Sequence, residues 1–270
     1  MNTPRTLLLP LGEDRPTIEV LEAGDGPPLV FLHGAGGIPA WVGVLPLLAE
    51  RFHVLAPLLP GYGQSTGLEH LDDQLDLTLH QFDVLAALEL QQPYVVGESM
   101  GGWIAAEMAA VRPREIARLA LLAPIGLWRD EYPVADMFGL MSDEMVPLLF
   151  HDQQCPAAQS MLALSSLISD KDDRSEAQIE TLIGMARGMR TAAKFLFPLP
   201  ETGLERRLWR ITAPTLIVWG AEDRFVSPTY GNLFRERIRG AQLTTIPGAG
   251  HLPGLEKPSE LARALIAFAE

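Results

Sequence analysis

The sequence predicts an α/β protein in which helices flank a mostly parallel β-sheet and a helical insertion interrupts the alternation. Runs of consecutive apolar residues, typical of strands buried on both faces of a parallel sheet, occupy residues 29–32, 94–97, 119–122 and 215–219. Stretches with apolar residues three or four positions apart separate most of these runs. Strand, helix and strand in alternation predict parallel pairing through right-handed crossovers. The alternation stops over residues 125–210, where the pattern is helical.

The other core elements follow from periodicity and from the turn residues between them. Alternating or short apolar runs predict strands, and apolar residues at helical spacing predict helices. Clusters of glycine and proline between these segments predict turns. We expect further strands at residues 17–23, 53–56 and 242–246, and further helices over residues 41–51, 75–90, 100–111 and 260–268.

The helical block divides the chain into an α/β core, residues 1–124 and 211–270, and a helical cap, residues 125–210. Within the cap, residues 142–150 predict a short helix, and Ser175-Glu176-Ala177-Gln178 is a capping box that opens a longer one. Methionine adapts to irregular apolar space, so the cap is interpreted as a lid over an apolar substrate, as a bundle with its own core, or as both. Six of the nine methionines lie in this block: Met137, Met141, Met145, Met161, Met185 and Met189.

Composition excludes several classes of protein. A chain of 270 residues that is 47% hydrophobic can bury a full core as one large domain, or as one domain with an insertion. A formal net charge of −13 leaves no basic stripe to neutralise phosphates, so we expect no nucleic-acid partner. The partner expected is a small-molecule substrate, and the chain is expected to be a monomer or a homodimer.

Cysteine content and hydropathy bear on location. The single cysteine, Cys155, excludes an internal disulfide framework and is compatible with a reducing cytosol, so a cytoplasmic location is expected. The leucine run at residues 7–9 is interrupted by Pro10 and Gly12 and is too short for a secretory signal. No stretch is long and apolar enough to predict a membrane span.

A serine between glycines is the main candidate for chemistry. Ser99 follows the apolar run 94–97, with Gly97 two residues before it and Gly101 two residues after it. A nucleophile at a sharp turn from strand to helix requires glycine at both positions, because a side chain there collides with the neighbouring backbone. The Met100 N–H, at the start of the following helix, is then placed to bind a developing oxyanion.

Asp223 and His251 are the predicted partners of Ser99. Each of the three residues follows the carboxyl end of a predicted strand, and those ends meet at one crevice of an open parallel sheet. Histidine can take the serine proton at neutral pH, and a carboxylate holds the imidazole in the required tautomer. Asp130, after the preceding strand, is the alternative acid.

A glycine-rich turn at residues 33–37 supplies a second oxyanion donor. Its backbone N–H groups can approach a ligand closely, and it lacks the lysine and hydroxyl residue of a phosphate-binding loop. The Ala35 N–H is the expected donor and the Gly36 N–H is the alternative. His33 is interpreted as a brace that holds this turn by hydrogen bonds. The remaining histidines show no metal-ligand spacing, so neither a metal nor a cofactor is expected.

Taken together, these motifs resemble the α/β-hydrolase fold family over nearly the full length of the chain. The resemblance implies a serine hydrolase with a Ser-His-Asp triad. Leu58 stands where many relatives carry aspartate, and the serine at position 99 differs from the aspartate nucleophile of haloalkane dehalogenases and epoxide hydrolases. The motifs are residues 33–37, 60–65, 97–102, 219–223 and 248–251, with Glu256 and Pro258 after the last.

The leading functional hypothesis is a cofactor-free esterase that forms an acyl-enzyme with a small to medium carboxylic ester, or a lactone, bearing an apolar part. The alternative is hydrolysis of carbon–carbon bonds in ring-fission (meta-cleavage) products, because Ser-Met-Gly-Gly is also similar to that subfamily. Those enzymes usually carry asparagine before the serine and tryptophan after the histidine, where this chain has Glu98 and Leu252. Arg187 or Arg190 in the cap would then hold the substrate carboxylate.

A third possibility is a ligand receptor without turnover. The expected substrate pocket comprises Trp128, Met137, Met141, Met185, Met189 and Leu252.

Overall fold

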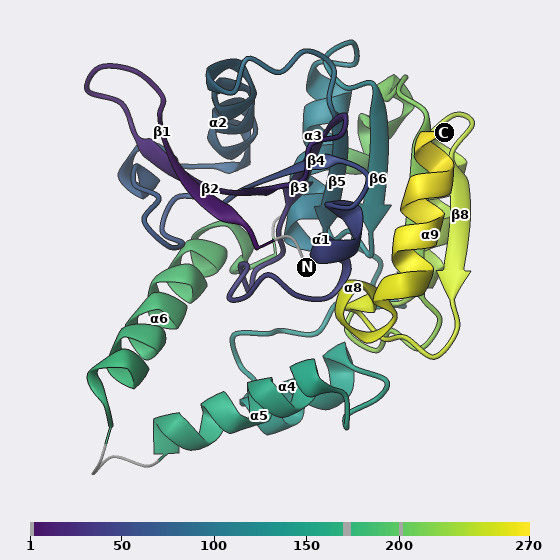
Figure 1. Cartoon of the computed structure of the whole chain (residues 1–270). Coiled ribbons are helices and arrows are strands. Elements are labelled where there is room, and N and C mark those ends of the chain that lie inside the picture. The colour runs from purple at the N-terminus through teal and green to yellow at the C-terminus, as the bar shows by residue number, and fades with distance from the viewer. Residues whose placement is uncertain (1–2, 170–173, 200–201) are drawn as a thin grey trace.

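The computed structural model describes residues 3–169, 174–199 and 202–270. Within these residues the strands form one eight-stranded sheet, in the order β1-β2-β4-β3-β5-β6-β7-β8 (Figure 1). β2 pairs antiparallel with both β1 and β4, and every pairing from β4 to β8 is parallel. The α/β class predicted from the sequence is therefore confirmed. The strands are β1 (Arg5–Pro10), β2 (Thr17–Ala23), β3 (Pro28–Leu32), β4 (His53–Pro57), β5 (Tyr94–Glu98), β6 (Arg118–Leu122), β7 (Thr215–Gly220) and β8 (Gln242–Ile246).

Helices cover both faces of the sheet, and the strand side chains alternate between them. Val95 and Leu121 face the cluster formed with α2 and α3, whereas Val96 and Leu122 face the cluster formed with α1 and α9. Because both faces are covered, the central strands are apolar at successive positions, which is why they read as continuous runs. The helices of the core are α1 (Val44–Leu48), α2 (Gln74–Ala87), α3 (Met100–Val111), α7 (Thr229–Arg237), α8 (Pro253–Glu256) and α9 (Pro258–Ala269).

Several elements differ from the sequence-based expectation. The leucine run near the N-terminus is strand β1, which pairs with β2 from Arg5 to Pro10. The helix expected over residues 41–51 is only α1, because Gly43 has a φ of 66° and the helix begins at the next residue. Helix α7 had no counterpart among the predicted elements.

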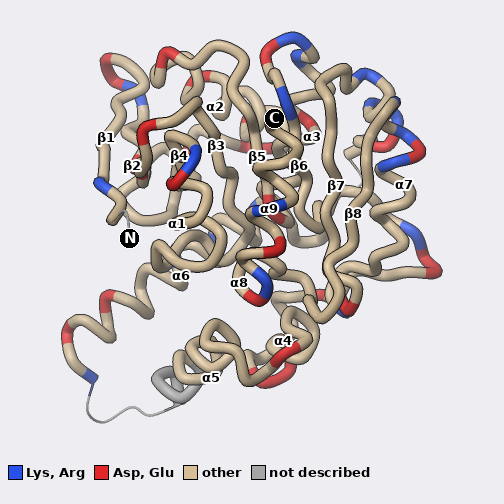
Figure 2. Tube along the Cα trace, turned by 45° about the vertical axis from the view of Figure 1, so that its right-hand side comes forward, with Lys and Arg blue, Asp and Glu red and all other residues tan. Residues whose placement is uncertain are grey.

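A helical insert lies between β6 and β7, and α4 (Ser142–Leu149), α5 (Pro156–Ser169) and α6 (Glu176–Leu196) form its main part. Figures 1 and 2 show these helices beyond the carboxyl ends of the parallel strands, with α6 set apart from α4 and α5. Thr191 of α6 donates a hydrogen bond of 2.9 Å to the carbonyl of Pro60, in the loop after β4. No helix in the described parts of the chain is long and apolar enough to cross a lipid bilayer.

The insert returns to the core through two 3₁₀ turns, Leu204–Arg206 and Leu208–Arg210, that pack against α3. Glu107, a fully buried carboxylate of α3, accepts hydrogen bonds from Arg207 Nε at 3.0 Å and Nη2 at 2.6 Å. Thr202 Oγ1 donates a third bond to it, at 3.2 Å. The end of the insert is thus tied to the helix that begins immediately after Ser99.

Candidate active site

Ser99 occupies a strained turn between β5 and α3. Its φ of 52° and ψ of −111° lie in a region that residues with a side chain rarely adopt. Two backbone bonds hold the turn: the Ser99 N–H donates to the Leu122 carbonyl, and the Ser99 carbonyl accepts from Trp103 N–H. A Cβ on Gly97 would lie 2.3 Å from the Gly101 carbonyl oxygen, so the tight turn requires glycine there.

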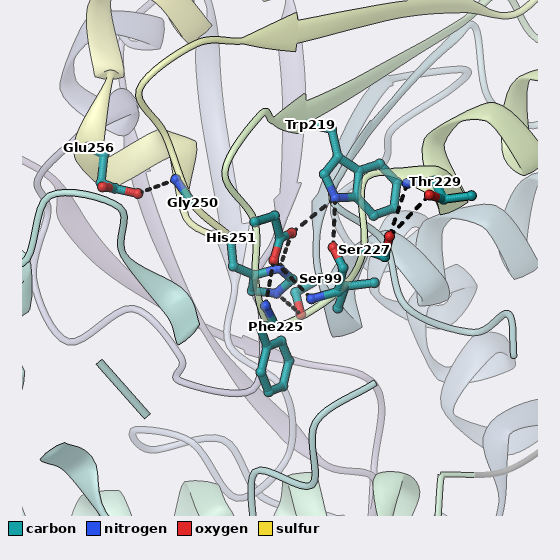
Figure 3. Close-up of polar contacts among 10 residues, drawn as sticks. Ser99, Trp219, Phe225, Ser227, Thr229, Gly250, His251 and Glu256 are labelled. Carbon is teal, nitrogen blue, oxygen red and sulfur yellow. Dashed lines mark hydrogen bonds and ion pairs between the residues drawn. The ribbon is translucent and has the colours of Figure 1, made fainter. Parts of the chain in front are cut away.

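The structure brings Ser99, His251 and Asp223 together at the carboxyl ends of β5, β8 and β7 (Figure 3). His251 Nε2 lies 2.9 Å from Ser99 Oγ, and His251 Nδ1 lies 2.8 Å from Asp223 Oδ2. All three residues are buried, with exposed fractions of 8% or less. Asp130, the alternative acid, instead accepts a hydrogen bond from the Trp128 indole at an exposed position.

The carboxylate of Asp223 is held by three donors besides His251. Oδ1 accepts from the backbone N–H groups of Phe225 and Val226, at 2.9 and 2.8 Å, and Oδ2 accepts from Trp219 Nε1 at 3.0 Å. These donors fix the orientation of the carboxylate toward His251. His251 Nδ1 therefore carries the proton, which leaves the Nε2 lone pair directed at the serine hydroxyl.

Trp219 was not among the residues predicted for the site, although it belongs to the motif at residues 219–223 that contains Asp223. Trp219 lies near the end of β7, four residues before Asp223 (Figure 3). Its indole Nε1–H donates to Asp223 Oδ2 and is also 3.1 Å from the Val226 carbonyl. A tryptophan just before the acid at a strand end was the available sequence signal.

The backbone of the insert supports the histidine loop. His251 N–H donates to the carbonyl of Leu149, at the end of α4, at 2.8 Å. Gly250 N–H donates to Glu256, and a Cβ at Gly250 would lie 2.5 Å from the same Leu149 oxygen. The position of His251 therefore depends on α4 as well as on the core.

The proposed oxyanion donors lie on two sides of the nucleophile. Ala35 lines the same cavity as Ser99, and Met100 is the first residue of α3. Among the described residues, the N–H groups of Met100, Ala35 and Gly36 donate to no protein acceptor. They are thus available to a ligand, and the start of a twelve-residue helix adds favourable dipole charge at Met100.

His33 braces the turn that carries Ala35, as the sequence suggested. Its Nδ1 donates to the Gly34 carbonyl at 2.7 Å, and its Nε2 accepts from Leu59 N–H at 3.0 Å. The acceptor role of Nε2 requires the neutral ring. Burial lowers the pKa of His33 to about 4, so the ring stays neutral at physiological pH. Tyr62 adds a second support by donating to the Ala35 carbonyl at 2.7 Å.

Glu98 precedes the nucleophile and is a second titratable group near the base. Burial raises the pKa of Glu98 to about 7, and the positive charge of His251 opposes that shift. Its carboxyl reaches toward α8, since a Cβ on Gly254 would lie 3.3 Å from Glu98 Oε1. The group therefore changes charge in the same pH range as a typical catalytic histidine.

A cavity of about 400 Å³ opens over Ser99. Core loops form its floor, and the first and last segments of the insert form its roof. Of the described residues that line the cavity, Asp136 is the single charged one. The Phe225 ring lies 4.8 Å from the imidazole of His251 and borders the floor (Figure 3). The lining residues are Ala35, Ser99, Ile125, Trp128, Val134, Ala135, Asp136, Met137, Phe138, Leu196, Phe197, Pro198, Leu199 and Phe225.

Two of the predicted pocket residues, Trp128 and Met137, line this cavity, and four do not. Met141 and Met185 are 58% and 39% exposed on the insert. Met189 lies on α6, and Leu252 packs in a separate cluster with α4 and α5. The segment directly after β6 supplies most of the roof, and its position after a strand that ends beside Ser99 was the signal that could have identified it.

Comparison with known proteins agrees with this architecture. A sequence model of the alpha/beta hydrolase fold family matches residues 27–258, and the chain belongs to that family. The chain is 28% identical to a 2-hydroxy-6-oxo-6-phenylhexa-2,4-dienoate hydrolase of Burkholderia cepacia, covering 93% of this chain and 90% of that one. It is 26% identical to a monoacylglycerol lipase of Homo sapiens, covering 91% and 76%. The crystal structure of a membrane phospholipase A superposes with a TM-score of 0.75 at 23% identity, covering 99% and 86%.

Metal ligation has no support in the described part of the chain. Its His, Cys, Asp and Glu side chains form no group of three or more placed to share a metal ion. Cys155 is buried among apolar residues of the insert and carries a free thiol.

Proposed function

We propose that this hydrolase cleaves small to medium carboxylic esters, or lactones, with an apolar part, through an acyl-enzyme on Ser99. The observation that carries the proposal is the chain of hydrogen bonds from Ser99 Oγ through His251 to Asp223, on the floor of an apolar cavity. A volume of about 400 Å³ is in the range of small-molecule sites.

Each step follows from this geometry. Ser99 Oγ attacks the carbonyl carbon while His251 Nε2 takes its proton, and Asp223 stabilises the imidazolium. The oxyanion binds the N–H groups of Met100 and of Ala35 or Gly36, each worth about 3 kcal/mol in the barrier. Collapse of the intermediate breaks the bond to the alkoxy group, which leaves with the proton from His251. Water, deprotonated by His251, then attacks the acyl-enzyme and releases the acid.

The nucleophile is tested with Ser99→Ala and a fluorophosphonate probe. We expect the wild type to hydrolyse 4-nitrophenyl butyrate and to be labelled at Ser99. The variant should lose about a thousandfold or more in kcat and escape labelling, with an unchanged melting temperature. Full turnover by Ser99→Ala would refute the mechanism. A wild type that binds esters tightly but is inert to the probe would instead support a receptor without turnover.

Carbon–carbon bond hydrolysis is the second candidate, and the similarity to the dienoate hydrolase of Burkholderia cepacia favours it. The ring-fission substrate of such an enzyme carries a carboxylate. Arg187 and Arg190 lie exposed on α6, and within the described part of the chain no lysine or arginine lines the cavity. The ester is therefore the better fit. Cleavage of a chromogenic dienoate with a kcat/KM above that for 4-nitrophenyl butyrate would reverse this order.

A further inference from the structure

Asp136 places a negative charge in the lining of the cavity. It lines the cavity together with Ser99 but belongs to the roof, at an exposed position. Its Oδ1 accepts one hydrogen bond, from Phe138 N–H at 3.0 Å. Within the described residues Asp136 forms no ion pair, and Oδ2 accepts no hydrogen bond. This oxygen is free to meet a ligand.

Aromatic rings line the same cavity as this carboxylate. Phe138 and Phe197 pack edge to face, with centroids 5.8 Å apart, and both line the cavity. Trp128 lines it as well, and its indole N–H is already directed to Asp130, at 2.8 Å. Phe197 is 60% exposed and Trp128 is 39% exposed, so ring surface remains open to a ligand. Aromatic faces and a carboxylate are the groups that bind organic ammonium ions in proteins.

The charges around the cavity favour a cation further. Arg129, seven residues before Asp136, does not line the cavity; its Nη2 donates two bonds of 2.7 and 2.9 Å to Glu205, a carboxylate that Arg237 also binds. Arg224 is exposed and does not line the cavity. The formal net charge of −13 attracts cations to the protein as a whole. Among the described residues that line the cavity, the charge that an anionic substrate meets is the like charge of Asp136.

We propose that the preferred substrates are esters with an ammonium group remote from the reacting carbonyl, and that Asp136 is the residue that determines this specificity. The inference rests on the proposed function, because it places the carbonyl at Ser99 and the cation at the roof of the same cavity. The ammonium group of the substrate lies between the Asp136 carboxylate and the aromatic rings. Esters of similar size that carry a carboxylate instead of an ammonium group are rejected there.

Butyrylthiocholine and S-(3,3-dimethylbutyl) thiobutyrate test the proposal, because they differ only by a quaternary nitrogen in place of a quaternary carbon. Release of the thiol gives kcat/KM for each. We expect the wild type to favour the cation by about fivefold to tenfold, as for a partly exposed ion pair with a cation–π contact. Asp136→Asn should reduce that preference to about twofold or less, through a lower kcat/KM for the cationic ester.

Two further variants separate the local charge from other effects. Asp143→Asn makes the same change at an exposed residue of α4 that does not line the cavity, and should keep the preference. Phe197→Leu keeps the site apolar but removes a ring, and should halve the preference or reduce it further. Equal kcat/KM for both esters in the wild type, or equal losses in Asp136→Asn and Asp143→Asn, would overturn the proposal.

The outcome is separable from that of the proposed function. Hydrolysis of both esters that depends on Ser99 but shows no preference for the cation rejects only the role of Asp136. If neither ester is turned over, calorimetric dissociation constants of the two esters with Ser99→Ala give the same comparison. Tighter binding of the cation, lost in Asp136→Asn, supports the inference, and equal binding rejects it.

Discussion

Replacement of His80 by leucine should make the protein less sensitive to acid. His80 lies on α2, is 6% exposed, and its Nε2 has no hydrogen-bond partner in the described structure. Burial lowers the pKa of His80 to about 4, and the nearby charge of Asp83 opposes the shift only in part. Leucine has a similar volume and no polar atom to bury, so the variant is expected to fold as the wild type does.

The magnitude follows from the two pKa values. An unfolded histidine titrates near pH 6.5, so between pH 7.5 and pH 5 the unfolded state gains a proton that folded His80 does not bind. Because the pKa of His80 is lower in the folded than in the unfolded state, its contribution to the free energy of unfolding is fully present above pH 6.5. That contribution falls as the pH drops toward 4. The loss amounts to about 2 kcal/mol by pH 5. His80→Leu should not show this loss of unfolding free energy, because it has no imidazole at position 80 to titrate.

Urea unfolding at pH 7.5 and pH 5 measures the effect. The difference in unfolding free energy between His80→Leu and the wild type should shift by about 2 kcal/mol in favour of the variant at the lower pH. Other buried groups such as His33 and Glu98 are common to both proteins, so their contributions cancel. His70→Leu, at an exposed histidine, controls for the substitution itself. A stability difference that does not change with pH would refute the reasoning.

Two more predictions concern the triad and the turn at the nucleophile. Asp223→Asn should lower kcat for 4-nitrophenyl butyrate by about 10³ to 10⁴, because the amide no longer enforces the required tautomer of His251, and a loss below tenfold would contradict the assigned role. Gly97→Ala should fail to give folded protein, since its Cβ meets the Gly101 carbonyl, whereas Gly184→Ala, with open space around it on α6, should gain up to about 1 kcal/mol in thermal unfolding. An unchanged melting temperature for Gly97→Ala would contradict the steric argument.

The sheet was predictable because its central strands are covered on both faces. Residues 29–32 and 119–122 are apolar at every position, and each forms part of a buried strand. β1 escaped detection because it is an edge strand whose residues are mostly exposed, so no buried pattern distinguishes its leucines. β1 is defined by its pairing with β2, and this pairing cannot be predicted from the local sequence.

The candidate triad was accessible for a related reason. Ser99, Asp223 and His251 each follow a recognisable strand, and the parallel topology alone brings strand ends to one edge of the sheet. The pocket was less accessible, because helical periodicity in the insert gives no docking angle. Met185 and Met141 were expected at the ligand on composition, yet they are exposed on the insert and do not line the cavity.

The ion pair between Glu107 and Arg207 defines how much of the insert can be exchanged with a relative. Removing Arg207 would leave the buried carboxylate of Glu107, on α3, without its cation, at a cost of about 3 to 5 kcal/mol. The helical pattern suggests residue 210 as the end of the insert. A chimaera that takes the insert of a relative up to that residue replaces Arg207 with the residue that the relative has at this position. Crossovers placed before Thr202 keep the pair. The segment that can be exchanged is therefore shorter than the helical block of residues 125–210. The last turns of that block have to stay with α3, because Arg207 pairs with Glu107.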